Sequence, residues 1–246
     1  MSGRTLSFPR LIGHRGVAGH APENTLAGIR QASVFGLRWV EFDVALTADN
    51  EPVLMHDDSI DRTTNGKGKL AALALGNLEG LDAGSWHSPA FAGEAVPTLM
   101  RALETARGLG LGINVEIKPT KGRDAETGAI VAQRVAAAWP GELPPPLLSS
   151  FKIDALRAAQ SAAPSVGRGY LMRRLHRGWQ REAAALDCVS VHCGQRLLSR
   201  RAAAEVRQAG YRLFSYTVND ASRARLLYDW GVESLFTDYP DRLLSI

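Results

Sequence analysis

The sequence predicts an α/β fold, a (β/α)₈ barrel of the TIM type with a small subdomain inserted near the barrel mouth. Short apolar runs alternate with helical patterns from end to end, which is typical of parallel βα units. Eight such runs occur, and 246 residues is a usual length for a barrel that forms one domain, 1–246. No glycine-rich phosphate-binding motif follows the first run, which disfavours the alternative, a doubly wound sheet.

The apolar runs and the helical periodicity define the expected elements. The predicted strands are centred near Ile12, Phe42, Val115, Leu148, Tyr170, Ser190, Ser215 and Phe236. The predicted helices span residues 24–35, 99–109, 125–138, 153–162, 180–186, 199–209 and 220–230. Glycine stands at the end of four of these helices, where a residue that tolerates left-handed backbone ends a helix readily: Gly36, Gly110, Gly210 and Gly231.

Two segments interrupt the repeat. The apolar run 52–56 follows the second strand too closely for a parallel crossover, so we expect an antiparallel hairpin that turns at 48–50 and brings His56 near Phe42 and Asp43. The alternative is an irregular barrel strand, which would also place His56 near the carboxylates. Residues 57–96 contain several glycines and only weak apolar stretches. A structureless loop of that length is unusual unless it is functional, so we expect a small inserted subdomain over the barrel mouth.

The composition is that of an ordinary globular protein with a modest net charge of +4. The arginine clusters are short and lack interleaved aromatic residues, so we expect solvated helix faces and no nucleic-acid partner. The two cysteines, Cys188 and Cys193, are expected to be buried free thiols of a reducing compartment. No apolar run suits a membrane span or a leader peptide, so we expect a cytoplasmic protein without stable membrane association.

Two predicted strands carry charged side chains on one face. Side chains two residues apart on a strand point the same way, so Glu41 lies with Asp43 and Glu116 with Lys118. Unpaired buried charge is costly, so these groups require neutralisation. Because carboxylate oxygens suit a hard cation, the three acidic residues are candidate ligands of one Mg²⁺ or Ca²⁺ ion. The alternative is a buried ion-pair network that only stabilises the fold.

Two histidines follow strands at the same end of the predicted barrel. His14 follows the first strand, and His56 follows the hairpin strand. Imidazole titrates near neutral pH, so these residues are candidates for a general acid and a general base. Arg15 and Lys118 are candidate phosphate ligands, because guanidinium and ammonium groups both bind phosphate oxygens.

Several motifs together resemble the glycerophosphodiester phosphodiesterase family, in its cytoplasmic bacterial type. They are His14-Arg15-Gly16, Pro22-Glu23-Asn24-Thr25, Glu41-Phe42-Asp43-Val44, His56-Asp57, Asp61-Arg62-Thr63-Thr64-Asn65-Gly66, Glu116-Ile117-Lys118, Ser149-Ser150-Phe151, Thr217-Val218-Asn219 and Thr237-Asp238-Tyr239-Pro240. The resemblance covers nearly the whole chain in the right order. It implies a barrel with a small insertion and hydrolysis of a glycerophosphodiester to sn-glycerol 3-phosphate and an alcohol.

The resemblance also implies roles for individual residues. Glu41, Asp43 and Glu116 would hold the divalent cation, His14 and His56 would form the acid/base pair, and Arg15 and Lys118 would bind the phosphate. Asn24 opens a helix, where capping is its ordinary role, and the resemblance adds a position beside the metal ligands. Two more residues are expected near the pocket: His192, at a strand end, and Tyr216, which stands where the family usually has tryptophan. Trp86 and His87 could line the pocket or form the core of the insertion.

Two alternative functions stay open at this point. One is a phosphodiesterase of the lysophospholipase D type on the same fold, for which Leu81, Trp86 and Phe91 would be the exposed apolar residues. The other is a catalytically silent barrel that binds phosphoesters. The identity of the metal, the alcohol, the division of roles between the histidines, water attack against a cyclic intermediate, and a possible homodimer are also open.

Overall fold

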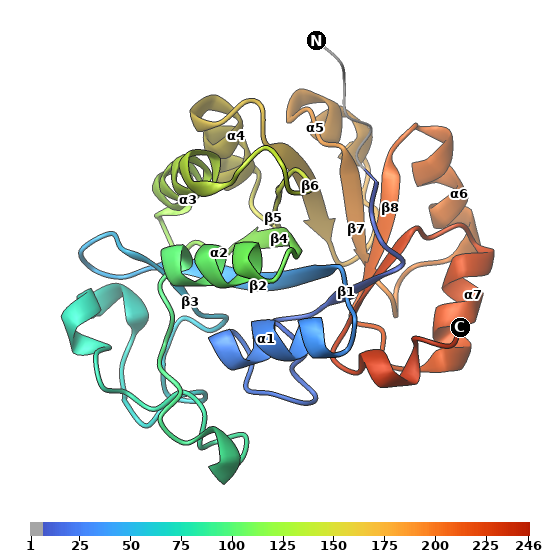
Figure 1. Cartoon of the computed structure of the whole chain (residues 1–246). Coiled ribbons are helices and arrows are strands. Elements are labelled where there is room, and N and C mark those ends of the chain that lie inside the picture. Colours follow the sequence, from blue (N-terminus) through green and yellow to red (C-terminus); the bar gives the residue numbers. More distant parts are fainter. Residues whose placement is uncertain (1–6) are drawn as a thin grey trace.

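The computed structural model describes residues 7–246, which form a ring of strands surrounded by helices (Figure 1). In chain order the strands and α-helices are β1 (Leu11–Gly13), α1 (Leu26–Val34), β2 (Trp39–Leu46), β3 (Pro52–Leu54), α2 (Leu99–Gly108), β4 (Gly112–Ile117), α3 (Asp124–Ala138), β5 (Leu147–Ser150), α4 (Ile153–Ala162), β6 (Gly167–Met172), α5 (Trp179–Ala185), β7 (Ser190–Gly194), α6 (Arg200–Gln208), β8 (Arg212–Tyr216), α7 (Ala221–Asp229) and β9 (Ser234–Thr237). Short 3₁₀ helices are η1 (Leu70–Ala72), η2 (Leu75–Asn77), η3 (Pro89–Phe91) and η4 (Pro240–Arg242).

Eight of the strands are parallel and close into a barrel. Their order is β1-β9-β8-β7-β6-β5-β4-β2, and β1 also pairs with β2, where Gly13 lies opposite Val40. The ninth strand, β3, is antiparallel to β2. The predicted barrel and the predicted hairpin are both confirmed. Each expected strand and helix overlaps an observed one.

The alternation of side chains along β2 separates two packing layers. Val40, Phe42 and Val44 face outward and belong to the large cluster that joins the strands to the helices. Trp39 faces inward at the start of the strand and packs into an aromatic cluster that fills the lower barrel: Phe8, Ile12, Trp39, Leu147, Phe214 and Phe236. Glu41 shares the inward face with Trp39 but lies nearer the carboxyl ends of the strands, where active sites of such barrels form.

The segment between β3 and α2 contains only the 3₁₀ helices η1 to η3. In Figure 1 it is the cyan and green loop region beside β3. Met55, Ile60, Leu70 and Leu78 are buried there with Ala45 and Val53 in a separate small hydrophobic cluster. The segment therefore has apolar contacts of its own, while the boundaries 57–96 of an inserted subdomain stay a prediction.

His192 lies inside the barrel, so the expectation that it lines the pocket is wrong. Its side chain is fully buried and stacks on Phe214 at 4.8 Å between ring centroids. Its Nε2 atom lies 2.9 Å from Ser190 Oγ. A Cβ on Gly169 would lie 2.6 Å from the same nitrogen, so glycine is required to leave room for the ring. The sequence pattern failed here because β7 continues to Gly194 and carries His192 below the mouth.

Two further expectations concern the cysteines and the length of the helices. Cys188 and Cys193 are buried and free, as expected, and burial raises the pKa of both thiols to about 12. Such thiols stay protonated and are poor nucleophiles. Within residues 7–246, no helix has both the length and the apolar character needed to cross a membrane.

Burial of His192 should make the fold sensitive to acid. Burial lowers the pKa of His192 to about 3, while the unfolded residue titrates near its ordinary value of 6.5. Between these values the unfolded chain binds the extra proton, so stability falls as the pH falls through that window. Between pH 7.5 and pH 5, we expect the free energy of unfolding to fall by about 2 kcal/mol more in the wild type than in His192→Gln. Urea denaturation at the two pH values measures this, and equal losses in both proteins would contradict it.

Candidate active site

The acidic cluster forms where β2 and β4 lie side by side. Their parallel register sets Asp43 opposite Glu116 and Glu41 opposite Asn114. One carboxylate oxygen from each of Glu41, Asp43 and Glu116 lies within 4.8 Å of the others. Glu41 and Asp43 are buried, and Glu116 is partly exposed. The three residues expected to hold a metal are therefore brought together.

The cluster fits a hard cation. Burial and the neighbouring carboxylates raise the pKa of Glu41 well above its usual value, and they raise the pKa of Glu116 to about 8. Among the described residues, nothing donates a hydrogen bond to the buried Glu41 Oε1. A divalent cation would relieve the repulsion and use this free oxygen, and an all-oxygen ligand set suits Mg²⁺ or Ca²⁺.

Asn24 fixes the position of Asp43. Its Nδ2 donates to Asp43 Oδ2 at 2.9 Å, and its Oδ1 accepts from the Asp43 backbone N–H at 2.9 Å. The residue adopts a positive φ of 56°, a region that asparagine tolerates better than most residues. Thr25 instead caps α1, because its side chain accepts from Gly28 N. The expected capping role of Asn24 is wrong, and its place beside the acidic cluster is what the resemblance implied.

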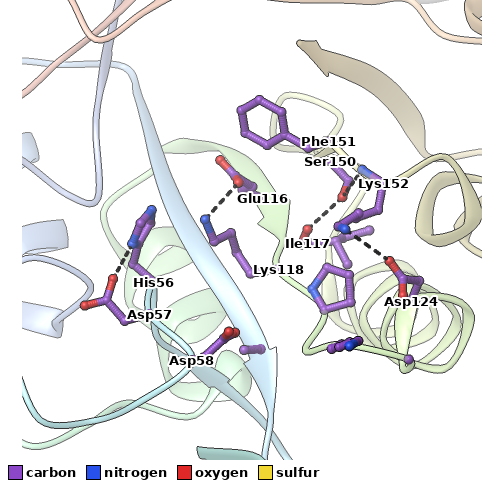
Figure 2. Close-up of a pocket in the computed structure, with 14 residues that line it drawn as sticks. His56, Asp57, Asp58, Glu116, Ile117, Lys118, Asp124, Ser150, Phe151 and Lys152 are labelled. Carbon is purple, nitrogen blue, oxygen red and sulfur yellow. Dashed lines mark hydrogen bonds and ion pairs between the residues drawn. The ribbon is translucent and has the colours of Figure 1, made fainter. Parts of the chain in front are cut away.

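Two cations flank the carboxylates. Arg15 donates its backbone N–H to Glu41 Oε2 at 2.8 Å, and its Nε lies 3.2 Å from Asp43 Oδ2. Lys118 Nζ lies 3.4 Å from Glu116 Oε1 (Figure 2). It also lies 3.9 Å from Asp43 Oδ1. Burial opposes the charge of Arg15, but Asp43, Glu23 and Glu41 outweigh it and raise its pKa. The Arg15 guanidinium therefore stays charged, and it lies with the Lys118 ammonium next to the cluster, where an anion could bind.

A tight turn after β1 directs Arg15 toward the cluster. Arg15 itself has a positive φ of 51°, and Gly16 has a φ of 89°. A Cβ on Gly16 would lie 2.6 Å from the backbone carbon of Gly28, so only glycine fits between this turn and α1. In the motif His14-Arg15-Gly16, the glycine is therefore required by the backbone of the turn, and the other two residues supply polar groups.

Each candidate acid/base histidine is held by a carboxylate. His14 Nδ1 lies 2.7 Å from Asp238 Oδ1, and His56 Nδ1 lies 2.7 Å from Asp57 Oδ1 (Figure 2 shows the latter pair). A carboxylate that engages Nδ1 fixes the ring and leaves Nε2 free for proton transfer. Burial lowers the pKa of His56, which favours its neutral form.

Sequence reasoning assigned no role to either carboxylate, although both stood in quoted motifs. Asp57 directly follows His56, which was a usable signal. Asp238 was harder to place, because it meets His14 only through the pairing of β9 with β1 that closes the barrel. Asn219 Nδ2 donates to the second oxygen of Asp238 at 2.7 Å and completes this support.

The candidate residues line two hollows at the barrel mouth. His56, Glu116 and Lys118 line a cavity of about 490 Å³, together with Phe151 and Lys152 (Figure 2). A second hollow of about 310 Å³ is lined by residues from the other side of the site: His14, Arg15, Ala18, Gly19, Glu23, Asp238 and Tyr239. The ion pairs from Arg15 and Lys118 to Asp43 connect the two sides through the acidic cluster.

Tyr216 stands beside the larger cavity. Its ring meets that of Phe151 edge to face at 5.8 Å between centroids. Its hydroxyl donates to the Met172 carbonyl at 3.0 Å, so the polar group has the partner that burial demands. Trp86 and His87 lie in the segment between β3 and α2 and are absent from the residues that line either hollow.

Comparison with known proteins gives a consistent result. Residues 14–242 match the model of the glycerophosphoryl diester phosphodiesterase family. A glycerophosphodiester phosphodiesterase of Caldanaerobacter subterraneus is 30% identical over 96% of both chains, and one of Bacillus subtilis is 29% identical over 97% of this chain and 87% of the relative. A phosphodiesterase of Oleispira antarctica, solved with its product sn-glycerol-3-phosphate, is 40% identical over 96% of both chains with a TM-score of 0.93. The chain therefore belongs to the glycerophosphoryl diester phosphodiesterase family and is a phosphoric diester hydrolase.

Proposed function

We propose that this enzyme hydrolyses small glycerophosphodiesters to sn-glycerol 3-phosphate and an alcohol, with one divalent cation and two histidines. The observation that carries the proposal is the cluster of Glu41, Asp43 and Glu116 at the barrel mouth, flanked by Arg15 and Lys118. An acidic cluster next to two cations suits a metal and a phosphate bound together. The product bound to the O. antarctica relative supports the same substrate class.

Glu41, Asp43 and Glu116 would hold the cation, which we propose to be Mg²⁺ or Ca²⁺. When bound, it supplies positive charge that stabilises the phosphoryl oxygens in the transition state. Arg15 and Lys118 add fixed positive charge from the protein, which binds the phosphate and orients it. Asn24 holds Asp43 in place through two hydrogen bonds and so keeps the ligand set ordered.

His14 and His56 would move the protons. One accepts a proton at Nε2 from the attacking hydroxyl, which belongs to water or to the glycerol of the substrate, and the other donates a proton from Nε2 to the leaving alcohol. If the glycerol hydroxyl attacks, this step gives a cyclic phosphodiester, which water then opens to sn-glycerol 3-phosphate with the two histidines in exchanged roles. Asp238 and Asp57 stabilise the imidazolium form of each ring through Nδ1.

The lipid-directed alternative has less support in the structure. Of the apolar residues considered for it, Leu81 packs against the hydrophobic cluster of the insertion, and Trp86 is 41% exposed. A single exposed aromatic ring is a small surface for binding lipid. Location in the cytoplasm, the lack of stable membrane association and a homodimer stay predictions.

Removal of the cation should abolish turnover. In excess EDTA we expect no release of glycerol 3-phosphate from glycerophosphocholine, and added Mg²⁺ or Ca²⁺ should restore it. The ion should also raise the melting temperature, since it relieves repulsion among buried carboxylates. Glu116→Gln should weaken this shift, while Glu104→Gln, an exposed residue of α2, should retain it. Full activity in excess EDTA would contradict the metal site.

Replacement of either histidine should reveal its role. We expect His14→Asn and His56→Asn each to lower kcat by about 10²- to 10⁴-fold, the usual contribution of general acid or base catalysis. A substrate with a p-nitrophenol leaving group needs little protonation, so it should rescue only the variant that lacks the general acid. Near-normal turnover in either variant with glycerophosphocholine would exclude that histidine from proton transfer.

Lys118 should contribute through its charge. We expect Lys118→Met to lower kcat/KM by about 10- to 100-fold, the effect of one hydrogen bond to a charged group. Lys69→Met, which removes an exposed lysine from the insertion, is the control and should behave as wild type. Steady-state kinetics measure kcat and KM of both variants. Unchanged values in Lys118→Met would exclude this residue from the phosphate site.

A further inference from the structure

We propose that Arg62, a residue of the insertion, is a positioning residue that holds the His56 imidazole and the Arg15 guanidinium together. The proposal rests on the proposed function, because it assumes that these two groups act on the substrate. It assigns a role in the reaction to the motif Asp61-Arg62-Thr63-Thr64-Asn65-Gly66, which belongs to neither hollow at the mouth.

Arg62 uses three donors on two carboxylates. Its Nε donates to Asp57 Oδ2 at 2.6 Å. Its two terminal nitrogens donate to the two oxygens of Glu23, each at 2.8 Å. This fork-to-fork geometry is specific to guanidinium, since an ammonium is a point charge that cannot engage both carboxylates in one plane.

The same two carboxylates hold the groups that we assign to chemistry. Asp57 Oδ1 lies 2.7 Å from His56 Nδ1, while Arg62 occupies the other oxygen. Glu23 Oε1 accepts from an Arg15 terminal nitrogen at 2.9 Å as well as from Arg62. Arg62 thus joins the two carboxylates into one continuous chain of contacts, which runs from His56 through Asp57, Arg62 and Glu23 to Arg15.

Arg62 also fixes the charge of its partners. Its hydrogen bond is the largest influence that lowers the pKa of Asp57, to about 2. Burial opposes the ionisation of Glu23, but hydrogen bonds from Arg62 and the charge of Arg15 outweigh it and lower the pKa of Glu23. Both carboxylates stay ionised and can orient the cationic groups that they contact.

The backbone on both sides of Arg62 is anchored. Ile60 and Thr64 are buried, and the Thr64 hydroxyl donates to the Ile60 carbonyl at 2.8 Å. Gly68 N–H donates to Asp61 Oδ1 at 2.7 Å and braces the same turn. Although the Arg62 side chain is 44% exposed, the turn that carries it is held by the cluster of the insertion.

A double-mutant cycle tests the proposal with glycerophosphocholine and saturating Mg²⁺. We expect Arg62→Gln to lower kcat about 10- to 100-fold, as loss of a group that orients an active-site ligand does, with little change in melting temperature. Arg62→Lys should not rescue kcat. In the Asp57→Asn background, Arg62→Gln should lower kcat by a smaller factor than in the wild type, because the part of its effect that acts through the His56 imidazole is already lost and only the part through Glu23 and Arg15 remains. Arg30→Gln, which removes an ion pair between α1 and Glu94 of the insertion, should behave as wild type.

Wild-type kcat in Arg62→Gln, recovery of kcat in Arg62→Lys, or an undiminished loss in the Asp57→Asn background would each overturn the proposal. An inactive wild-type enzyme would instead count against the proposed function. The positioning role is then tested by ¹⁵N NMR of the His56 ring, which needs no turnover. The wild type should show a single tautomer with the proton on Nδ1, and Arg62→Gln should show exchange between two. An identical single tautomer in both proteins would overturn the proposal.

Discussion

The site depends on the repulsion among three carboxylates that the register of β2 and β4 forces together. Glu41, Asp43 and Glu116 face inward, where the barrel offers little water to screen them. Arg15 and Lys118 offset part of this charge, yet the pKa values of Glu41 and Glu116 stay raised. The protein alone does not neutralise the cluster. A bound divalent cation would complete it and would leave the two cations of the protein available to the phosphate.

Around this cluster, each polar group is held by another part of the chain. Asn24 holds Asp43 from the loop before α1, and Asp238 holds His14 from the end of β9. The aromatic cluster below the site fills the lower barrel and packs between the strands that carry the polar groups. Side chains fixed in this way need little reorganisation when charge develops on the substrate, which is how preorganised sites accelerate reactions.

Much of the fold and of the site could be predicted because the signals were local. The alternation of charge on Glu41 and Asp43 gave their shared face, and the short link before Pro52 gave the hairpin that carries His56. The predictions that were wrong concerned residues whose roles depend on tertiary contacts. Asn24 precedes a helix as a cap would, but only the approach of β2 shows that Thr25 caps the helix while Asn24 binds Asp43. His192 looked like a strand-end residue because a sequence does not show how far β7 extends above it.

The carboxylates that hold the histidines and arginines of the site were also difficult to predict from the sequence. Asp57 is next to His56 in the sequence, but Glu23 and Asp238 meet groups that lie far from them along the chain, so their charge alone does not reveal their partners. Closure of β9 onto β1 and the turn that carries Arg62 supply that information. A sequence thus predicts groups that carry chemistry more readily than the groups that orient them.

The proposed function depends most directly on a metal ion bound by the three carboxylates next to the phosphate. Anomalous diffraction from crystals grown with Mn²⁺ and sn-glycerol 3-phosphate tests it most directly, provided that Mn²⁺ restores activity to the chelated enzyme. We expect one strong anomalous peak among Glu41, Asp43 and Glu116, with the phosphate of the product between it and Arg15 and Lys118. An active Mn²⁺ enzyme whose crystals show no peak at this cluster would contradict the claim.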